Sequence, residues 1–285
     1  MNLRDVRRRL KSVENTRKIT RAMEMVAGAK LKQLESALSR ARPYIEGLQS
    51  LLSRLLAEYP GQHHSLFEKR EGTGHTGLIL ITSDTGLCGS YNSDLVAEAE
   101  RWFETKPADK AELLTVGLFG HNYCLARGLK PHASFTDFKS RADQGAVQRL
   151  LESVVGLFTG GGAVSIEVIS CYFRSAASWG PRRMRLLPLE VGRDAKPNPY
   201  PTLLEPGAKE VFEALVPRVL EGVLRQALLE AFSAEQSARM MAMRNATDNA
   251  DDMVKELTLT RNKVRQAQIT KEIIEVVSGA EGLKS

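Results

Sequence analysis

Residues Ser233 to Ala280, "SAEQSARMMAMRNATDNADDMVKELTLTRNKVRQAQITKEIIEVVSGA", decide the fold of this chain. Neither proline nor glycine occurs between Val223 and Val277. Such a stretch can form about 80 Å of continuous helix, at 1.5 Å per residue. A helix of that length does not fit inside a globular domain, so it must pair with another long element.

The apolar pattern of this stretch is typical of a coiled coil with one irregularity. From Leu220 to Ala238 the small or apolar positions alternate in steps of four and three, and the same alternation resumes at Ala250 and Met253. Between them the pattern steps by four at Ala242 and Ala246, a shift that locally unwinds a coiled coil. The alanines predict close approach of a partner helix.

The N-terminal segment is the predicted partner. Its apolar positions recur at helical spacing from Leu3 to about Leu56, with Pro43 as the expected kink. Ile19, Met23 and Val26 are among these apolar positions. A narrow face of small residues, Ala22, Ala27, Gly28 and Ala29, is predicted to match the alanine seam of the C-terminal helix. We therefore predict that the two ends of the chain form a long antiparallel coiled coil.

The middle of the chain changes period and is predicted to be an α/β domain. "GLILITSD" (77–84), "ELLTVGLFG" (112–120), "AVSIEVISCYFRS" (163–175) and "RRMRLLPLEV" (182–191) read as strands, and helical patterns lie between them. This alternation predicts a Rossmann-like open sheet. The expected organisation is an N-terminal coiled-coil helix (1–58), a central α/β domain (75–195), a Pro-rich link (196–207) and a C-terminal helix (208–285).

The charge of the chain is concentrated at its N-terminus. The formal net charge is +6, and residues 1–42 alone hold twelve Lys or Arg against four Asp or Glu. Aromatic side chains for base stacking are missing there, because the first aromatic residue is Tyr44. An acidic protein surface therefore explains the basic segment as well as a nucleic acid does.

Composition argues against several other classes. Cys88, Cys124 and Cys171 are far apart in sequence, which favours reduced thiols over a disulfide or zinc site. No stretch approaches the roughly 20 apolar residues of a membrane-spanning helix, and we expect no targeting segment. Any membrane association is expected to come through a partner.

Two motifs invite a catalytic or binding interpretation, which the residues do not favour. "SDTGLCGSYN" (83–92) lies between a strand and a helix as phosphate loops do, yet it lacks the glycine spacing and the lysine of such loops. His63, His64 and His75 sit in Gly-containing loops without convergent ligands. We expect no catalytic, cofactor or metal site, and read the first motif as a tight turn with a buried Cys88.

Three segments of the sequence resemble a known protein family. "SVENTRKITRAMEMVAGAKL" (12–31), "SDTGLCGSYN" (83–92) and the stretch 233–280 closely resemble the gamma subunit family of F-type ATP synthases, in family order and over nearly the whole chain. The resemblance implies a non-catalytic rotor shaft inside a ring of alpha and beta subunits. It also implies an epsilon subunit and a c-ring as partners, and one copy of this chain in each complex. No nucleic acid is implied. The expected location is peripheral, on the cytoplasmic face of a bacterial inner membrane.

The resemblance also implies which residues meet the beta subunits. On the N-terminal helix these are Met23 and the basic residues Arg7, Arg8, Arg9, Lys18, Arg21, Lys30 and Lys32. On the C-terminal helix they are Arg244, Arg265, Gln266, Thr270 and Glu275. The last turns form an apolar bearing tip: Ile269, Ile273, Ile274, Val276 and Val277. A basic nucleic-acid-binding coiled coil and a nucleotide-dependent α/β enzyme are the alternative functions.

Overall fold

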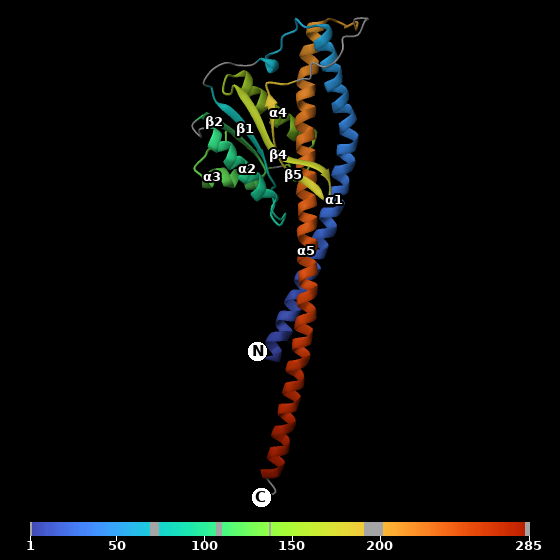
Figure 1. Ribbon diagram of the computed structural model, residues 1–285, viewed down its shortest axis with the longest axis vertical. Coiled ribbons are helices and arrows are strands. Elements are labelled where there is room, and N and C mark those ends of the chain that lie inside the picture. The colour runs from blue at the N-terminus through green and yellow to red at the C-terminus, as the bar shows by residue number, and fades with distance from the viewer. Residues whose placement is uncertain (1, 69–73, 107–109, 137, 191–201, 283–285) are drawn as a thin grey trace. The chain divides into compact units, whose positions relative to one another are not determined.

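Two long helices begin and end the chain, and an α/β region lies between them in sequence (Figure 1). The computed structural model describes residues 2–68, 74–106, 110–136, 138–190 and 202–282. Helix α1 (Leu3–Glu58) runs through Pro43 without ending, and helix α5 (Ala208–Gly282) contains Pro217. The 75 residues of α5 correspond to about 112 Å of helix. Part of the predicted Pro-rich link, residues 196–201, lies outside the described residues.

The chain divides into two compact units, and the division cuts both long helices. The first unit comprises residues 1–27 and 239–285, and the second comprises residues 28–238. Each unit therefore contains one part of α1 and one part of α5, and each has its own buried residues.

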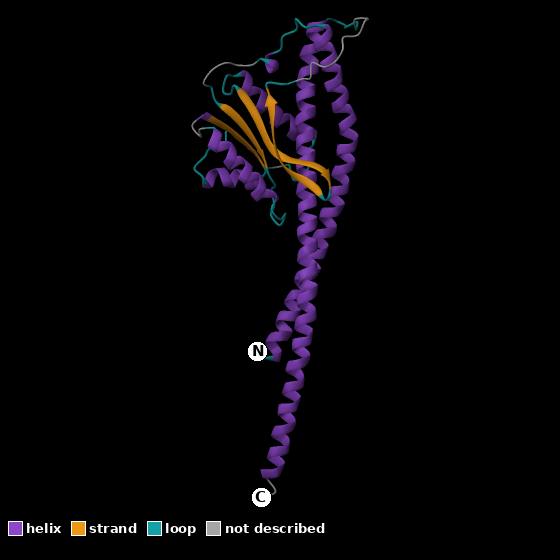
Figure 2. Cartoon of the chain, viewed as in Figure 1, coloured by secondary structure: helices purple, strands orange, loops and turns teal. Residues whose placement is uncertain are grey.

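The second unit contains a five-stranded sheet with the order β3-β2-β1-β4-β5 (Figure 2). Its strands are β1 (Thr76–Ile81), β2 (Ala111–Val116), β3 (Ala133–Phe135), β4 (Ser165–Ser175) and β5 (Ser178–Leu187). The first four in this order are parallel, and β5 is antiparallel to β4. The predicted open α/β sheet is confirmed, although the three-residue edge strand β3 was not predicted.

Among the described residues, one short helical segment precedes β1 and three helices connect the parallel strands. They are η1 (Ser65–Phe67), α2 (Tyr91–Thr105), α3 (Leu118–Ala126) and α4 (Gln144–Thr159). All six residues of β1 are buried, as expected for a central parallel strand that is covered on both faces. The side chain of Asp143 caps α4 by accepting a hydrogen bond from the backbone N–H of Ala146 at 2.9 Å.

Within the second unit, one stretch of α5 is fully buried. Every residue from Ala227 to Ala238 is buried. On one side α1 approaches closely, because a Cβ added at Gly222 would lie 3.2 Å from the side chain of Ile45. On the other side the ring of Phe232 lies 5.9 Å from that of Phe138. The predicted seam from Leu220 to Ala238 is buried throughout.

Within the first unit, α1 and α5 are antiparallel, as predicted. Three side-chain pairs join them: Arg17 with Asp251 at 2.7 Å, Thr20 with Thr247 at 2.8 Å, and Glu24 with Arg244 at 3.7 Å. The residue number of the partner on α5 falls as the residue number on α1 rises, so the two helices run in opposite directions. Val6 and Leu10 of α1 are also buried in this unit.

Not every apolar position of the α1 pattern faces α5. Ile19 and Val26 are 60% and 57% exposed, whereas Thr20 and Ala27 are buried. The strip of small residues was also only partly right, because Ala27 is buried but Ala22 and Ala29 are exposed. The 3.6-residue period rotates the apolar stripe away from the partner, and a short polar pair takes its place.

The predicted seam of α5 was also displaced in this unit. Met243 and Thr247 are buried where Ala242 and Ala246 were predicted, and Met253 is 50% exposed. The buried and half-buried positions from Met243 through Thr247, Ala250, Val254 and Leu257 keep steps of four and three. The predicted positions Ala250 and Leu257 thus hold, while Met243, Thr247 and Val254 replace Ala242, Ala246 and Met253.

Candidate functional site

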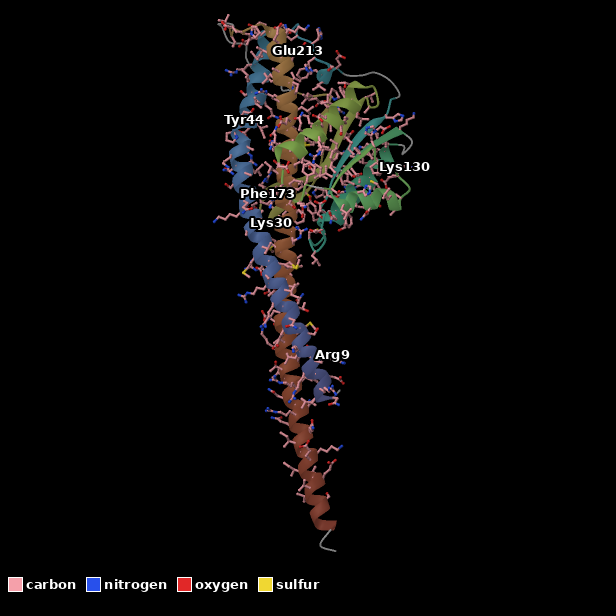
Figure 3. The ribbon with its side chains drawn as sticks, turned by 180° about the vertical axis from the view of Figure 1, so that it is seen from behind. Arg9, Lys30, Tyr44, Lys130, Phe173 and Glu213 are labelled. Carbon is pink, nitrogen blue, oxygen red and sulfur yellow. The ribbon has the colours of Figure 1, made fainter. Side chains whose placement is uncertain are left out.

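The predicted basic residues of α1 lie on its exposed surface. In the first unit these are Arg7, Arg8, Arg9, Lys18 and Arg21; in the second unit they are Lys30 and Lys32. Figure 3 labels Arg9 and Lys30 on this helix. Arg8 lies 3.4 Å from Asp5 in a highly exposed pair. Such pairs contribute little to stability, which leaves these charges available to an external surface.

Two predicted residues lie closer to the helix pair itself. Met23 is half-buried, and Arg244 forms its 3.7 Å ion pair with Glu24 of α1. The Arg244 side chain remains 63% exposed. Arg244 therefore holds the two helices together on one side and faces outward on the other.

The end of α5 carries the remaining predicted residues and has no covering element among the described residues. All residues from Arg265 to Ser278 are exposed. Thr270 donates a hydrogen bond to the carbonyl oxygen of Gln266 at 3.0 Å, and Glu275 lies 3.5 Å from Lys271. The five apolar tip residues, Ile269, Ile273, Ile274, Val276 and Val277, are 48% to 72% exposed. An exposed apolar run of this kind is typical of an interaction surface.

A second exposed apolar surface was missed by the sequence reasoning. Ile19, Met25 and Val26 of α1 are each more than half exposed. Their apolar character was visible in the sequence, but Ile19 and Val26 were used only as evidence for a helix. These side chains lie on the helix that carries the predicted basic residues, so they extend the candidate contact surface.

A buried polar network in the second unit was also missed. Glu230 of α5 pairs with Arg182 of β5 at 3.1 Å, and Glu235 accepts a hydrogen bond from Ser140 at 3.1 Å. The Tyr91 hydroxyl donates to the Ala231 carbonyl at 3.1 Å. These bonds fix α5 to the α/β region, because buried polar groups are costly unless they are paired. Polar residues beside the alanine seam were the only sequence signal.

The loop 83–92 forms an internally bonded turn. Asn92 accepts a hydrogen bond from the backbone N–H of Ser83 at 3.2 Å and donates to the Ser83 hydroxyl at 2.7 Å. Asn92 also donates to the sulfur of the buried Cys88 at 3.4 Å. Ser83, Cys88 and Asn92 thus bond to one another, and Asp84 accepts hydrogen bonds from the backbone of Leu118 and Lys139, which supports the interpretation as a structural turn.

Thiol and metal chemistry find little support among the described residues. Burial raises the pKa of the Cys124 thiol to about 11, and burial raises the pKa of Cys171 as well. Both thiols are therefore protonated at neutral pH. Within the described ranges, no three His, Cys, Asp or Glu side chains are arranged to hold a metal ion.

Comparison with known proteins identifies the family. A family model described as "ATP synthase" matches residues 2–283. The ATP synthase gamma chain of Heliobacterium modesticaldum is 37% identical over 99% of both chains, and that of Moorella thermoacetica is 38% identical over the same shares. The chain belongs to the ATP synthase gamma family. This result confirms the family resemblance that the sequence showed.

Solved structures agree with the gamma-family fold. A chain from the rotor of Euglena gracilis mitochondrial ATP synthase aligns with a TM-score of 0.65 at 19% identity, covering 94% of this chain and 98% of that one. A chain from the central stalk and c-ring of the Tetrahymena thermophila mitochondrial enzyme gives 0.60 at 24% identity, covering 80% and 99%. Among the described helices, none combines the length and the apolar character required to cross a bilayer.

Proposed function

We propose that this chain is the central rotor shaft of an F-type ATP synthase, present as one copy per complex. In this role it carries rotation between a c-ring in the membrane and the catalytic sites of the beta subunits. The single observation that carries the proposal is the uncovered end of α5, where every residue from Arg265 to Ser278 is exposed although five are Ile or Val. In a gamma-family chain, a sleeve of alpha and beta subunits is the surface that would cover it.

The shaft itself supplies no catalytic group in this proposal. It acts by making different contacts with successive beta subunits, and such differential contacts shift each catalytic site between conformations. The complex is placed at the cytoplasmic face of a bacterial inner membrane, where the gamma chain is a peripheral subunit beside epsilon. No cofactor or nucleic acid takes part.

The contact residues divide into two chemical kinds. The exposed cations of α1 face acidic loops of the beta subunits. Polar contacts nearer the C-terminus of α5 are made by Arg265, Gln266, Thr270 and Glu275. The tip residues turn as an apolar bearing. Exposed charge pairs stabilise a complex by less than about 1 kcal/mol each, so they can release and form again as the shaft turns.

Co-expression with alpha and beta subunits tests the function. We expect a complex with one copy of this chain and three copies of each partner, and we expect it to hydrolyse ATP. Formation of an active alpha–beta complex that never incorporates this chain would contradict the proposal. ATP hydrolysis by the isolated chain would contradict its non-catalytic role.

Met23→Lys tests the placement of the contact surface. A new cation beside acidic beta loops adds a strong contact and should reduce the coupling of ATP turnover to ion pumping. Leu203→Lys is the matched control, since Leu203 is 84% exposed and lies in the second unit. Unchanged coupling in Met23→Lys, or equal impairment in both variants, would overturn the placement of Met23.

A further inference from the structure

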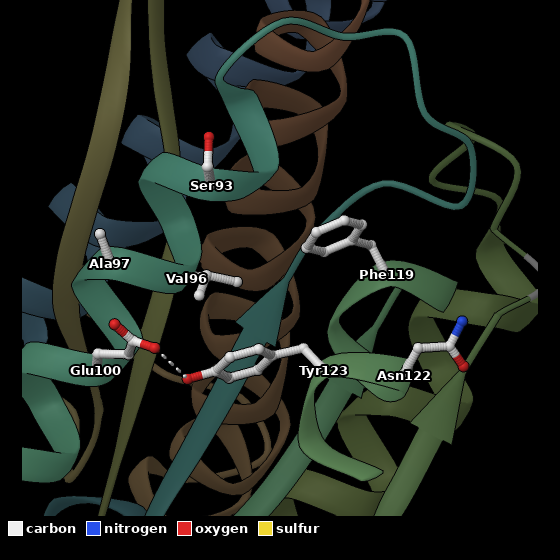
Figure 4. A pocket seen from close by; sticks show the side chains of 7 residues that line it. All are labelled: Ser93, Val96, Ala97, Glu100, Phe119, Asn122 and Tyr123. Atoms are coloured by element: carbon white, nitrogen blue, oxygen red, sulfur yellow. Dashed lines mark hydrogen bonds between the residues drawn. The ribbon is translucent and has the colours of Figure 1, made fainter. Parts of the chain in front are cut away.

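A pocket between α2 and α3 of the second unit has no role in the proposed shaft function. The cavity has a volume of about 500 Å³ (Figure 4). Val96 and Ala97 of α2 and the rings of Phe119 and Tyr123 of α3 line it. This volume lies within the range of roughly 300 to 1,000 Å³ that is usual for small-molecule sites.

The helix that forms one wall is unusually apolar for its position. The α3 sequence LFGHNYCLA contains no Asp, Glu, Lys or Arg. Leu118, Phe119 and Leu125 are 44%, 42% and 51% exposed. A surface helix normally turns charged residues to solvent, so these exposed apolar side chains mark a binding surface.

The carboxylate at the polar end of the pocket, Glu100, already pairs with a cation. The Tyr123 hydroxyl donates to the Glu100 carboxylate at 3.3 Å, as the dashed line in Figure 4 shows. The Arg127 guanidinium pairs with the same carboxylate and lies 5.4 Å from the centre of the Tyr123 ring. Its side chain is 52% exposed, so solvent reaches it and it can move aside. Carboxylate and ring face together therefore select a positive group.

We propose that this pocket binds a small aromatic cation, with one ring on Phe119 and Val96 and one amidinium or ammonium group on Glu100. The aromatic ring of the ligand packs against the exposed apolar side chains of α3. The cation takes the position between Glu100 and Tyr123 that Arg127 now shares. The ligand and the Arg127 side chain thus compete for the same carboxylate.

Benzamidine and its uncharged analogue benzamide provide the probes. Isothermal titration and NMR of the full-length chain should show saturable binding of benzamidine, with shifted Tyr123 and Phe119 ring signals. Benzamidine should bind about tenfold more tightly than benzamide, because a hydrogen bond to a charged group is worth at least that ratio. Equal affinity for both probes, or no saturable binding of benzamidine, would overturn the proposal.

Three variants locate the effect. Glu100→Gln should remove the preference for benzamidine, while Glu104→Gln, an exposed carboxylate on the same helix, should keep it. Arg127→Ala should strengthen benzamidine binding several-fold, since it removes the competing cation. Weaker binding in Arg127→Ala, or equal losses in the two glutamate variants, would contradict the assigned site. Wild-type circular dichroism in all three variants is required for the comparison.

Discussion

Two stretches of the one helix α5 lie in opposite environments, and their compositions are the reverse of what burial alone would suggest. Between Ala227 and Ala238 every residue is buried, yet five of the twelve are Glu, Gln or Ser. Between Arg265 and Ser278 every residue is exposed, yet five of the fourteen are Ile or Val. Neighbouring structure, not hydrophobicity, decides which part of a long helix is interior.

The comparison separates two uses of a helix surface. In the buried stretch, side chains are fixed by partners within the chain, and polar groups are tolerated because each contact is specific. In the exposed stretch, apolar side chains have no described partner within the chain, and the proposed function gives them one outside it. Substitutions in the first should therefore change folding stability, and substitutions in the second should change assembly.

The largest effect is expected from removing a ring in the buried stretch. Phe232→Ala should lower the free energy of unfolding by about 3–5 kcal/mol, because it leaves a cavity beside Phe138. Ile273→Ala, at a 57% exposed site, should change it by less than about 0.5 kcal/mol. Urea unfolding followed by far-UV circular dichroism, which reports the helices of both units, measures both. Similar losses in the two variants would break the comparison.

A smaller loss is expected from the ion pair that joins β5 to the buried stretch. Arg182→Met should cost about 1–3 kcal/mol of unfolding free energy, because Glu230, only 6% exposed, loses a cation. Its hydrogen bond from Gln226 remains and limits the cost. Arg185→Met removes an exposed pair with Glu190 and should cost less than about 0.5 kcal/mol. An Arg182→Met chain as stable as the wild type would show that the buried polar network is dispensable.

The polar pair in the first unit tests whether two short side chains act together. Thr20→Val and Thr247→Val should each cost about 0.5–1.5 kcal/mol, because each removes the bond between the two hydroxyls. The remaining hydroxyl keeps its backbone partner, the carbonyl of Met243 for Thr247 or of Arg17 for Thr20. The double variant should cost clearly less than the two together, since each single variant already loses the same bond. A thermal-unfolding double-mutant cycle gives the coupling. Strict additivity would mean that the 2.8 Å bond contributes nothing specific.

The smallest effect on stability is expected from removing the tip. Deletion of residues 273–285 should leave the α/β region folded, because the described part of the deleted segment buries none of its side chains. Assembly with alpha and beta subunits, or the torque of the complex, should weaken. Deletion of residues 279–285 alone is the matched control that keeps the apolar tip. Unfolding of the second unit on deletion of 273–285 would refute the assignment of the tip as an external contact.

The sequence predicted the elements better than their contacts. The long helix α5 followed from the missing proline and glycine, and the open sheet followed from four apolar runs. The edge strand β3 was missed because three residues give no usable periodicity. The outward rotation of Ile19 and Val26 was missed because the inner face depends on which residues of α5 stand opposite.

The candidate surfaces show the same division. The exposed cations and the apolar tip could be named from sequence because charge and helix length expose them in almost any packing. The pocket beside Tyr123 could not, since Glu100 and Arg127 are 27 residues apart and meet only through the folding of α2 and α3. Nor could the buried role of Glu230, which depends on Arg182 in a different strand.

The antiparallel register of the first unit has a mechanical consequence. Arg17 of α1 stands opposite Asp251, so Leu3, the first helical residue, reaches only to about residue 265 of α5. Up to about residue 265, α1 and α5 share a sideways load. From there to its C-terminal end, α5 carries the load alone. Because bending stiffness rises steeply with thickness, the last turns of α5 deflect first. The chain thus combines a stiff rod and a compliant end in one uninterrupted helix.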